Sequence, residues 1–151
     1  MSATIEQRLA RLEDLEQIRA LVKAYARHLD ARDFAAYAAL FARDGEWAGA
    51  SGRASTPAGI QAMLEQRIPP RVEAPGETHF HLVADPAIEL DGDEAHGVTT
   101  WALIVRGRDD TPVMRFYGRY LDRFVREDGR WRFARRETFT DVPDKPPVPR
   151  S

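Results

Sequence analysis

The chain has 151 residues, a formal net charge of -2 and no cysteine. Because its 22 basic and 24 acidic side chains almost cancel, no strong field attracts nucleic acid or an anionic membrane. The lack of cysteine excludes disulfides, thiolate metal sites and cysteine nucleophiles. A content of 43% hydrophobic and 30% charged residues is typical of a globular chain, and no apolar run suits a signal peptide or a membrane span. A single cytoplasmic domain is therefore expected.

Helical periodicity governs the first part of the chain. Apolar residues recur at spacings of three and four over residues 5–29, which predicts one long amphipathic helix. Asp33 can cap a second helix whose apolar face runs from Phe34 to Phe41 and which is followed by Gly45. The two predicted helices therefore meet near Asp30.

A short strand at 46–48 and a third helix follow. Thr56 and Pro57 are the N-cap and first-turn residues that typically begin a helix. This helix must end before Pro69, because proline lacks the backbone donor and restricts the residue that precedes it. The N-terminal half is thus predicted to be mainly helical.

The second half of the chain has the pattern of β-strands. Asp91-Gly92 and Asp128-Gly129 tolerate positive φ in tight hairpins, so the segments they join should pair antiparallel. The predicted strands are residues 78–90, 94–106, 113–127 and 130–142. Helices followed by a meander of long strands predict an α+β fold with helices on one face of a curved sheet. Residues 1–142 would form this domain, and the proline-rich residues 143–151 an extended tail.

Four segments, in their order and spacing, resemble the SnoaL-like, nuclear transport factor 2-like superfamily over roughly residues 5–142. They are Tyr25-Ala-Arg-His-Leu-Asp30 at the end of the first helix, Asp44-Gly-Glu-Trp47, His81-Leu-Val-Ala-Asp-Pro86 with Glu89-Leu-Asp-Gly-Asp93, and Asp128-Gly-Arg-Trp-Arg-Phe-Ala-Arg135. The resemblance implies a cone-like α+β barrel, with N-terminal helices packed on a curved, mostly antiparallel sheet around an apolar pocket. Fold alone does not select among the functions of a superfamily.

The pattern most resembles a branch that holds scytalone dehydratase, bile acid dehydratase and hexachlorocyclohexane dehydrochlorinase. These enzymes remove a proton and a leaving group without a cofactor, and they pair a histidine with an aspartate. The resemblance carries these two roles to His81 and Asp30. Tyr25 matches the helix tyrosine of the bile acid enzyme, and Trp47 matches a pocket tryptophan of the dehydrochlorinase. A lysine of the dehydrochlorinase has no obvious counterpart here.

His81 and Asp30 suit acid–base chemistry, because a carboxylate bonded to one ring nitrogen orients a histidine and makes the other nitrogen a useful base. The residues alone leave plainer interpretations open, in which His81 is a polar residue of a half-exposed strand and Asp30 ends a helix. Alternation puts His79 and His81 on the face opposite Phe80 and Leu82, so His81 faces inward only if the sheet covers a cavity.

A metal site is the less favoured interpretation of the two histidines on this strand. His79 and His81 would need a third convergent ligand, such as Glu89 or His96. The helical N-terminal half does not suit the all-β barrel in which such a pair is typical. No metal is therefore expected.

An arginine of the last strand completes the expected site. The resemblance leaves Arg135 and Arg136 as candidates, and Arg135 shares a face with Trp131 and Phe133, so Arg135 is expected to point toward the pocket and stabilise negative charge. A surface ion pair is the plainer role of such an arginine. The further side chains expected to contact substrate are Trp47, Trp101, Phe116, Tyr120 and His79.

The favoured hypothesis is a cofactor-independent lyase of the dehydratase kind, or an isomerase, that acts on a small, mostly apolar organic substrate. A noncatalytic module that binds a small ligand or assembles through its sheet is the alternative from another class. A polyketide cyclase or epoxide hydrolase of the same fold is a second enzymatic alternative. Because the outer face of a large curved sheet needs cover, a homodimer or homotrimer is also expected.

Overall fold

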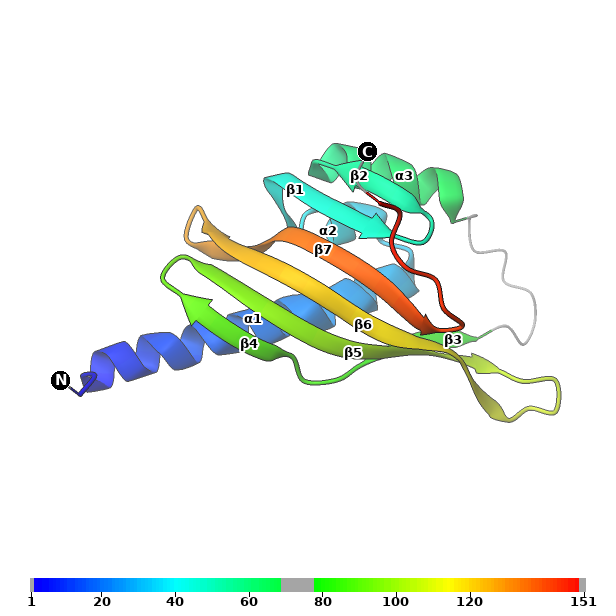
Figure 1. The fold of residues 1–151 in the computed structure, drawn as a ribbon, viewed down its shortest axis with the longest axis horizontal. Coiled ribbons are helices and arrows are strands. Elements are labelled where there is room, and N and C mark those ends of the chain that lie inside the picture. Colours follow the sequence, from blue (N-terminus) through cyan, green and yellow to red (C-terminus); the bar gives the residue numbers. More distant parts are fainter. Residues whose placement is uncertain (1, 69–77, 150–151) are drawn as a thin grey trace.

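A computed structural model describes residues 2–68 and 78–149. The helices lie behind one broad curved sheet (Figure 1). They are α1 (Ile5–Ala31), α2 (Phe34–Ala38) and α3 (Pro57–Arg67). The strands are β1 (Phe41–Gly49), β2 (Gly52–Ser55), β3 (His79–Val83), β4 (Ala87–Asp91), β5 (Glu94–Arg106), β6 (Pro112–Glu127) and β7 (Arg130–Val142). Along these described helices, no stretch has the length and apolar character that a membrane crossing requires.

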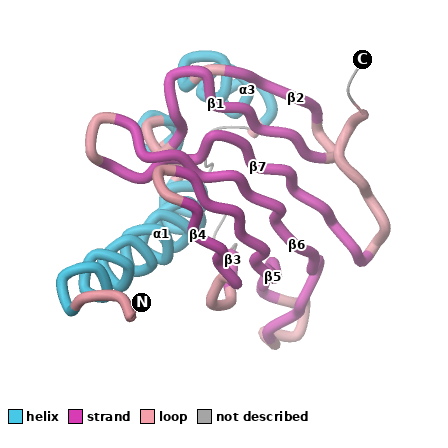
Figure 2. Tube along the Cα trace, turned by 60° about the vertical axis from the view of Figure 1, so that its left-hand side comes forward, coloured by secondary structure: helices cyan, strands magenta, loops and turns pink. Residues whose placement is uncertain are grey.

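The described strands form one seven-stranded sheet in the order β2-β1-β7-β6-β5-β3, with β4 pairing beside β3 on the same edge of β5. All pairs are antiparallel except β1 with β7, which run parallel. Figure 2 shows this sheet curving, with α1 crossing behind it. The predicted α+β architecture is therefore confirmed, with a sheet that remains open rather than closing into a full barrel.

Helix α1 has a well-defined start and end. Thr4 and Gln7 form a capping box at its N-terminus, and Arg32 ends it in the left-handed conformation at φ 59°. Its apolar stripe is buried only in the second half. Ile5, Leu9 and Leu12 stay exposed, because the first turns project past the sheet edge (Figure 1).

The second helix is shorter than predicted. It ends at Ala38, and Phe41 already belongs to β1, which begins five residues before the strand expected at 46–48. The Phe133 backbone N–H donates to the Leu40 carbonyl at 2.9 Å, so pairing with β7 draws this stretch into the sheet. The predicted caps, Asp33 on α2 and Thr56 on α3, are both present.

The single strand predicted over 78–90 is interrupted. It forms β3 and β4, which pair with successive parts of β5 and are separated by Ala84, Asp85 and Pro86. Pro86 has no backbone N–H for the ladder, which is a physical reason for the break. The expected hairpin turns are present, and Asp128 and Gly129 both have positive φ, at 51° and 75°.

A β-bulge reverses the alternation of side chains in β7. Phe133 is opposite Phe124, whereas Arg135 is opposite Arg123, so Ala134 is an extra residue without a partner in the ladder. Beyond this residue the inward positions change parity. Arg136 therefore follows Phe133 into the interior, and the inward orientation expected for Arg135 is wrong.

The described part of the C-terminal tail packs on the same chain. Lys145 exchanges two backbone hydrogen bonds with Thr140. The Val148 N–H donates to the Gly49 carbonyl at 3.2 Å, and Arg53 donates back to the Val148 carbonyl at 3.2 Å. These contacts hold residues 145–148 against β7 and the β1–β2 turn, while the domain boundary at 142 stays a prediction.

A buried ion pair joins β6 and β7 at the centre of the core. Arg136 donates from Nε and Nη2 to the two carboxylate oxygens of Asp122, at 2.7 and 2.6 Å, and neither side chain is accessible to solvent. The guanidinium carbon lies 4.0 Å from the ring centroids of Tyr25 and Tyr120 and 4.2 Å from that of Phe133. Helix α1 is thereby tied to both strands.

Replacing Asp122 with alanine should destabilise the fold strongly. The change leaves a charged Arg136 buried without its counter-ion, and breaking such a pair costs about 3–5 kcal/mol. Urea unfolding of Asp122→Ala measures this loss. Asp141→Ala is the matched control, because Asp141 pairs with Arg119 between the same two strands but in partly exposed positions, where the cost is about 0–1 kcal/mol. Equal losses in the two variants would contradict a structural role for the buried pair.

Candidate active site

Asp30 and His81, which are 51 residues apart in sequence, are in direct contact. Asp30 lies at the end of α1, and His81 is in the middle of β3. The Asp30 Oδ2 accepts the backbone N–H of His81 at 2.9 Å, and Oδ1 lies 2.6 Å from the His81 Nδ1. Because both carboxylate oxygens are used, the carboxylate is fixed and holds the imidazole in one orientation. Their side chains are only 21% and 15% exposed.

His81 borders a small apolar cavity of about 170 Å³ between the helices and the concave face of the sheet. Phe80 and Leu82, its neighbours in β3, point to the opposite face and are about half exposed. His81 therefore faces inward, which the sequence allowed only if the sheet covered a cavity. The lining residues are Tyr25, Leu29, Tyr37, Trp47, Ser51, Met63, Leu64, Arg67, Ile68, His81, Trp101, Tyr120 and Thr138.

Aromatic side chains with polar tips make up much of the cavity wall. The Trp47 indole N–H donates to the Tyr25 hydroxyl at 3.0 Å, and a hydrogen bond also links the Tyr25 and Tyr37 side chains. Burial raises the pKa of Tyr37 and of Tyr120 well above the usual value. Both phenols therefore stay protonated at neutral pH.

Arg136 stands directly behind this wall. Burial disfavours its charge, but the Asp122 carboxylate beside it holds the pKa of the guanidinium above its usual value. The cation lies 4.0 Å from the Tyr25 and Tyr120 ring centroids and does not line the cavity itself. The two aromatic rings therefore separate the guanidinium from the cavity, and the Asp122 carboxylate balances its charge.

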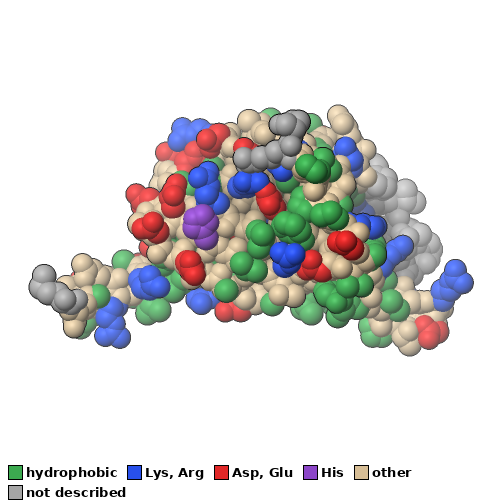
Figure 3. Space-filling view, viewed as in Figure 1, with side chains coloured by type: hydrophobic (Ala, Val, Ile, Leu, Met, Phe, Trp, Pro, Cys, Tyr) green, Lys and Arg blue, Asp and Glu red, His purple; other side chains and the backbone are tan. Residues whose placement is uncertain are grey.

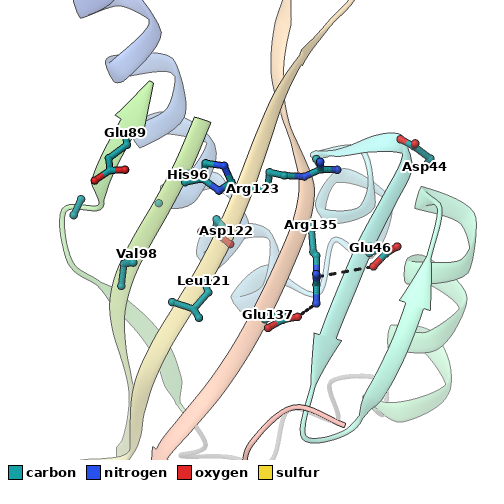
Figure 4. A pocket seen from close by; sticks show the side chains of 13 residues that line it. Asp44, Glu46, Glu89, His96, Val98, Leu121, Asp122, Arg123, Arg135 and Glu137 are labelled. Atoms are coloured by element: carbon teal, nitrogen blue, oxygen red, sulfur yellow. Dashed lines mark ion pairs between the residues drawn. The ribbon is translucent and has the colours of Figure 1, made fainter. Parts of the chain in front are cut away.

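Arg135 lies on the other side of the sheet. It lines a broad outer groove of about 740 Å³, where it pairs with Glu137 and its Nε is 4.0 Å from Glu46 (Figure 4). A surface ion pair of this kind was the alternative to a role in the pocket that the sequence left open for Arg135. Arg135 is thus separated from His81 by the sheet, because the bulge at Ala134 turns it outward.

Two further expected contact residues also lie away from the cavity. His79 lines a separate pocket of about 210 Å³ at the far end of β3. Phe116 packs against the core, and the Lys145 ammonium of the tail lies 5.2 Å from its ring centroid. Of the expected substrate contacts, the cavity therefore contains Trp47, Trp101 and Tyr120.

The residues of the alternative metal set do not converge. Glu89 and His96 are paired across β4 and β5 and line the outer groove (Figure 4), whereas His81 faces the inner cavity. Within residues 2–68 and 78–149, no three histidine or acidic side chains are grouped as metal ligands.

Several lining residues were not predicted from the sequence. Met63 and Leu64 come from α3, whose helical periodicity was clear, although nothing in that pattern indicated that this face closes a cavity. Thr138 faces inward only because the bulge at Ala134, four residues earlier in β7, changes which residues of the strand point to the interior. The phase of β7 therefore could not have been obtained from residue types, since Arg135 and Arg136 are chemically identical.

Residues 10–137 match the SnoaL-like domain family. The chain belongs to this family. The resemblance of its segments to SnoaL-like proteins is thereby confirmed over most of the predicted range. A comparison with curated proteins gives no match.

Several solved structures have the same fold as this SnoaL-like chain. An NTF2-like protein with a cystatin-like fold from Novosphingobium aromaticivorans is 24% identical, with a TM-score of 0.76 over 91% of this chain and 90% of its own. LinA is 22% identical, with a TM-score of 0.71 over 88% and 89%. A candidate scytalone dehydratase from N. aromaticivorans is 23% identical, with a TM-score of 0.68 over 98% and 99%. At these identities the likeness establishes the fold, and the chemistry has to be argued from the site.

The contact with Asp30 should hold neutral His81 in the tautomer that carries its proton on Nδ1. The carboxylate can only accept a hydrogen bond, so the proton belongs on the nitrogen that faces it. Long-range ¹H–¹⁵N correlation spectra of the imidazoles report the tautomer, with the exposed His96 as an internal control. In Asp30→Ala, His81 should revert to the tautomer mixture of an unconstrained histidine. A dominant Nε2–H form of His81 in the unsubstituted protein would contradict this assignment.

Proposed function

We propose that this SnoaL-like protein is a cofactor-independent lyase of the dehydratase kind, or an isomerase, that acts on a small, mostly apolar substrate. The observation that carries the proposal is the 2.6 Å contact between His81 Nδ1 and Asp30 beside an apolar cavity. A histidine oriented by a carboxylate and facing an apolar cavity is a usual arrangement of a general base. The likeness to a candidate scytalone dehydratase fits this class of reaction.

His81 would begin the reaction. Its Nε2 takes a proton from a carbon of the substrate, and the electron pair of the broken C–H bond forms a new double bond. In a lyase, the leaving group departs from the neighbouring carbon with its bonding electrons, and the protonated His81 can return the proton to that group. Asp30 stabilises the imidazolium that exists between these two steps. An isomerase would instead return the proton to a different carbon.

Tyr25 is placed to stabilise the negative charge that develops on the substrate. Its hydroxyl, which accepts from Trp47 and is hydrogen-bonded with Tyr37, would donate its own proton to an oxygen of the substrate. The guanidinium of Arg136 lies 4.0 Å from the Tyr25 ring centroid, and because Asp122 balances its charge, its role would be to position the Tyr25 ring. Arg135, for which a direct electrostatic role was expected, lies on the outer face.

Removal of His81 should abolish most of the activity. General acid–base groups contribute about a hundredfold to ten-thousandfold, so His81→Ala should lower kcat/KM by at least about a hundredfold. One-ring β-hydroxy ketones, beginning with 3-hydroxycyclohexanone, are the test substrates, because loss of water gives a conjugated enone that absorbs in the ultraviolet. Asp30→Asn should lower kcat without a comparable rise in KM, since Asp30 orients the base and does not line the cavity.

His96→Ala is the matched control, because His96 lies on the outer face of β5, away from the cavity. The control should keep the rate of the unsubstituted protein. Equal rates in His81→Ala and His96→Ala would remove His81 from the mechanism. Failure of the unsubstituted protein to convert any of these substrates, together with binding that survives loss of His81, would favour the noncatalytic alternative.

The convex face of the sheet supports a second proposal, that two or three copies of this chain associate through it. Hydrophobic side chains gather over its middle and right-hand part, and charges of both signs gather toward its left (Figure 3). The exposed apolar residues of this face include Phe80, Leu82, Val98 and Tyr117. The groove contains both acidic and basic groups, so in a two-fold dimer, where the same patch meets itself, its charges could pair with opposite charges of the second copy.

Leu82→Glu should shift the protein toward the monomer. A charge introduced on this apolar face would have to be buried in the interface without a partner. Light scattering coupled to gel filtration measures the mass. Leu9→Glu is the matched control, since Leu9 is as exposed as Leu82, at 55%, but lies on the projecting turns of α1. A monomeric mass for the unsubstituted protein would contradict the association.

A further inference from the structure

Arg67 is the only side chain with a permanent charge among the described residues that line the inner cavity. It lies in the last turn of α3, and its exposure to solvent places it at the mouth of the cavity. No described aspartate or glutamate lines this cavity, and within residues 2–68 and 78–149 no carboxylate forms an ion pair with Arg67. The guanidinium therefore stands at the entrance without a counter-ion among these residues.

Gly52, the first residue of β2, makes room for this guanidinium. A Cβ atom added at Gly52 would lie only 3.1 Å from Nη2 of Arg67, which is closer than most such contacts. Figures 1 and 2 both show α3 beside the hairpin of β1 and β2. A cation in the last turn of a helix also suits the helix dipole, but that role does not require the side chain to reach Gly52. The hairpin therefore helps to set the position of the charge.

The polar groups at the mouth suit a carboxylate. Ser51 precedes Gly52, lines the same cavity and is exposed, so its hydroxyl belongs to the same entrance as Arg67. A guanidinium donates parallel hydrogen bonds that match the two oxygens of a carboxylate. One guanidinium balances one negative charge, whereas a phosphate group, with a charge of about -1.5 to -2, would keep part of its charge without a partner.

The interior of the cavity suits an apolar body. Its volume of about 170 Å³ equals about six water molecules at ~30 Å³ each, which is room for one substituted ring. Its walls are mainly aromatic and apolar side chains, among them Trp101 and Met63. An anion at the exposed mouth stays partly in water, so its binding does not require full desolvation. A molecule with one ring and one carboxylate is therefore complementary to both parts of the cavity.

We propose that Arg67 binds the carboxylate of a single-ring substrate whose ring occupies the cavity. The carboxylate stays at the mouth, and the ring extends inward to the wall that contains His81. The carboxylate is an anchor, because it acidifies a neighbouring C–H bond much less than a ketone does, and a carbonyl group of the ring activates the proton that His81 removes. That the bound molecule is a substrate rests on the proposed function, whereas binding of the carboxylate does not.

Cyclohexanecarboxylate and cyclohexanecarboxamide test the proposal without turnover, because they have nearly the same shape and differ in charge. Isothermal titration calorimetry at neutral pH should give tighter binding of the anion, and added sodium chloride should weaken only the binding of the anion. In ¹H–¹⁵N spectra, the indole signals of Trp47 and Trp101 should shift when the anion binds. The signal of Trp131, which donates to Asp14 outside the cavity, should not shift.

Arg67→Gln removes the charge and keeps a long polar side chain. It should weaken binding of cyclohexanecarboxylate about five- to twentyfold, between the effects of exposed and of buried charge-assisted contacts. Its affinity for the amide should stay unchanged, which also verifies the fold of the variant. Arg11→Gln is the matched control, because Arg11 is an exposed arginine of α1 that does not line the cavity. The control should bind the anion as the unsubstituted protein does.

Four results would overturn the proposal. They are no measurable binding of cyclohexanecarboxylate, equal affinity for the anion and the amide, binding that shifts neither Trp47 nor Trp101, and equal affinities of Arg67→Gln and Arg11→Gln for the anion. Loss of anion binding in His81→Ala but not in Arg67→Gln would place the carboxylate at His81 and overturn it as well.

The same His81→Ala variant separates this proposal from the proposed function. Loss of turnover with anion binding intact is the result expected if both proposals hold. Unchanged turnover with anion binding intact would remove the base assignment alone and leave the carboxylate site at Arg67 standing.

Discussion

The ion pair between Arg136 and Asp122 is the interaction on which the arrangement of this molecule depends. Both charges lie in a core that excludes water, so each needs the other, and the double hydrogen bond fixes β7 against β6 at one register. Three aromatic rings surround the guanidinium, and two of them, Tyr25 and Tyr120, also line the cavity. The pair that stabilises the core therefore also positions two aromatic rings of the cavity wall.

A second constraint comes from the curvature of the sheet. In β3, the polar His81 faces inward, while the apolar Phe80 and Leu82 face outward, which inverts the usual distribution for a strand at the surface. The inversion is tolerated because Asp30 at the end of α1 satisfies both the ring and the backbone N–H of His81. The apolar residues that it leaves outside are the residues through which we propose that copies of the chain associate. The inner site and the outer face are thus consequences of one strand orientation.

Membership of the SnoaL-like family establishes the fold but leaves the chemistry open, since one fold supports many functions. What each member of such a family binds or converts therefore depends on the side chains of its site, which differ on a common backbone fold. In this chain, the proposed chemistry rests on His81, which Asp30 orients beside the cavity.

The sequence by itself determined the local structure and the family. Apolar residues at spacings of three and four located α1, and the capping residues Asp33 and Thr56 located the starts of α2 and α3. The Asp128-Gly129 dipeptide located the last hairpin. Each of these features depends on neighbouring residues alone. Segments of the sequence that resemble SnoaL-like proteins also led to His81 and Asp30. Only the tertiary structure decided their contact, since it joins residues 51 positions apart. Likewise, the extra residue Ala134 arises from pairing with β6, and that long-range pairing turns Arg136 inward and Arg135 outward.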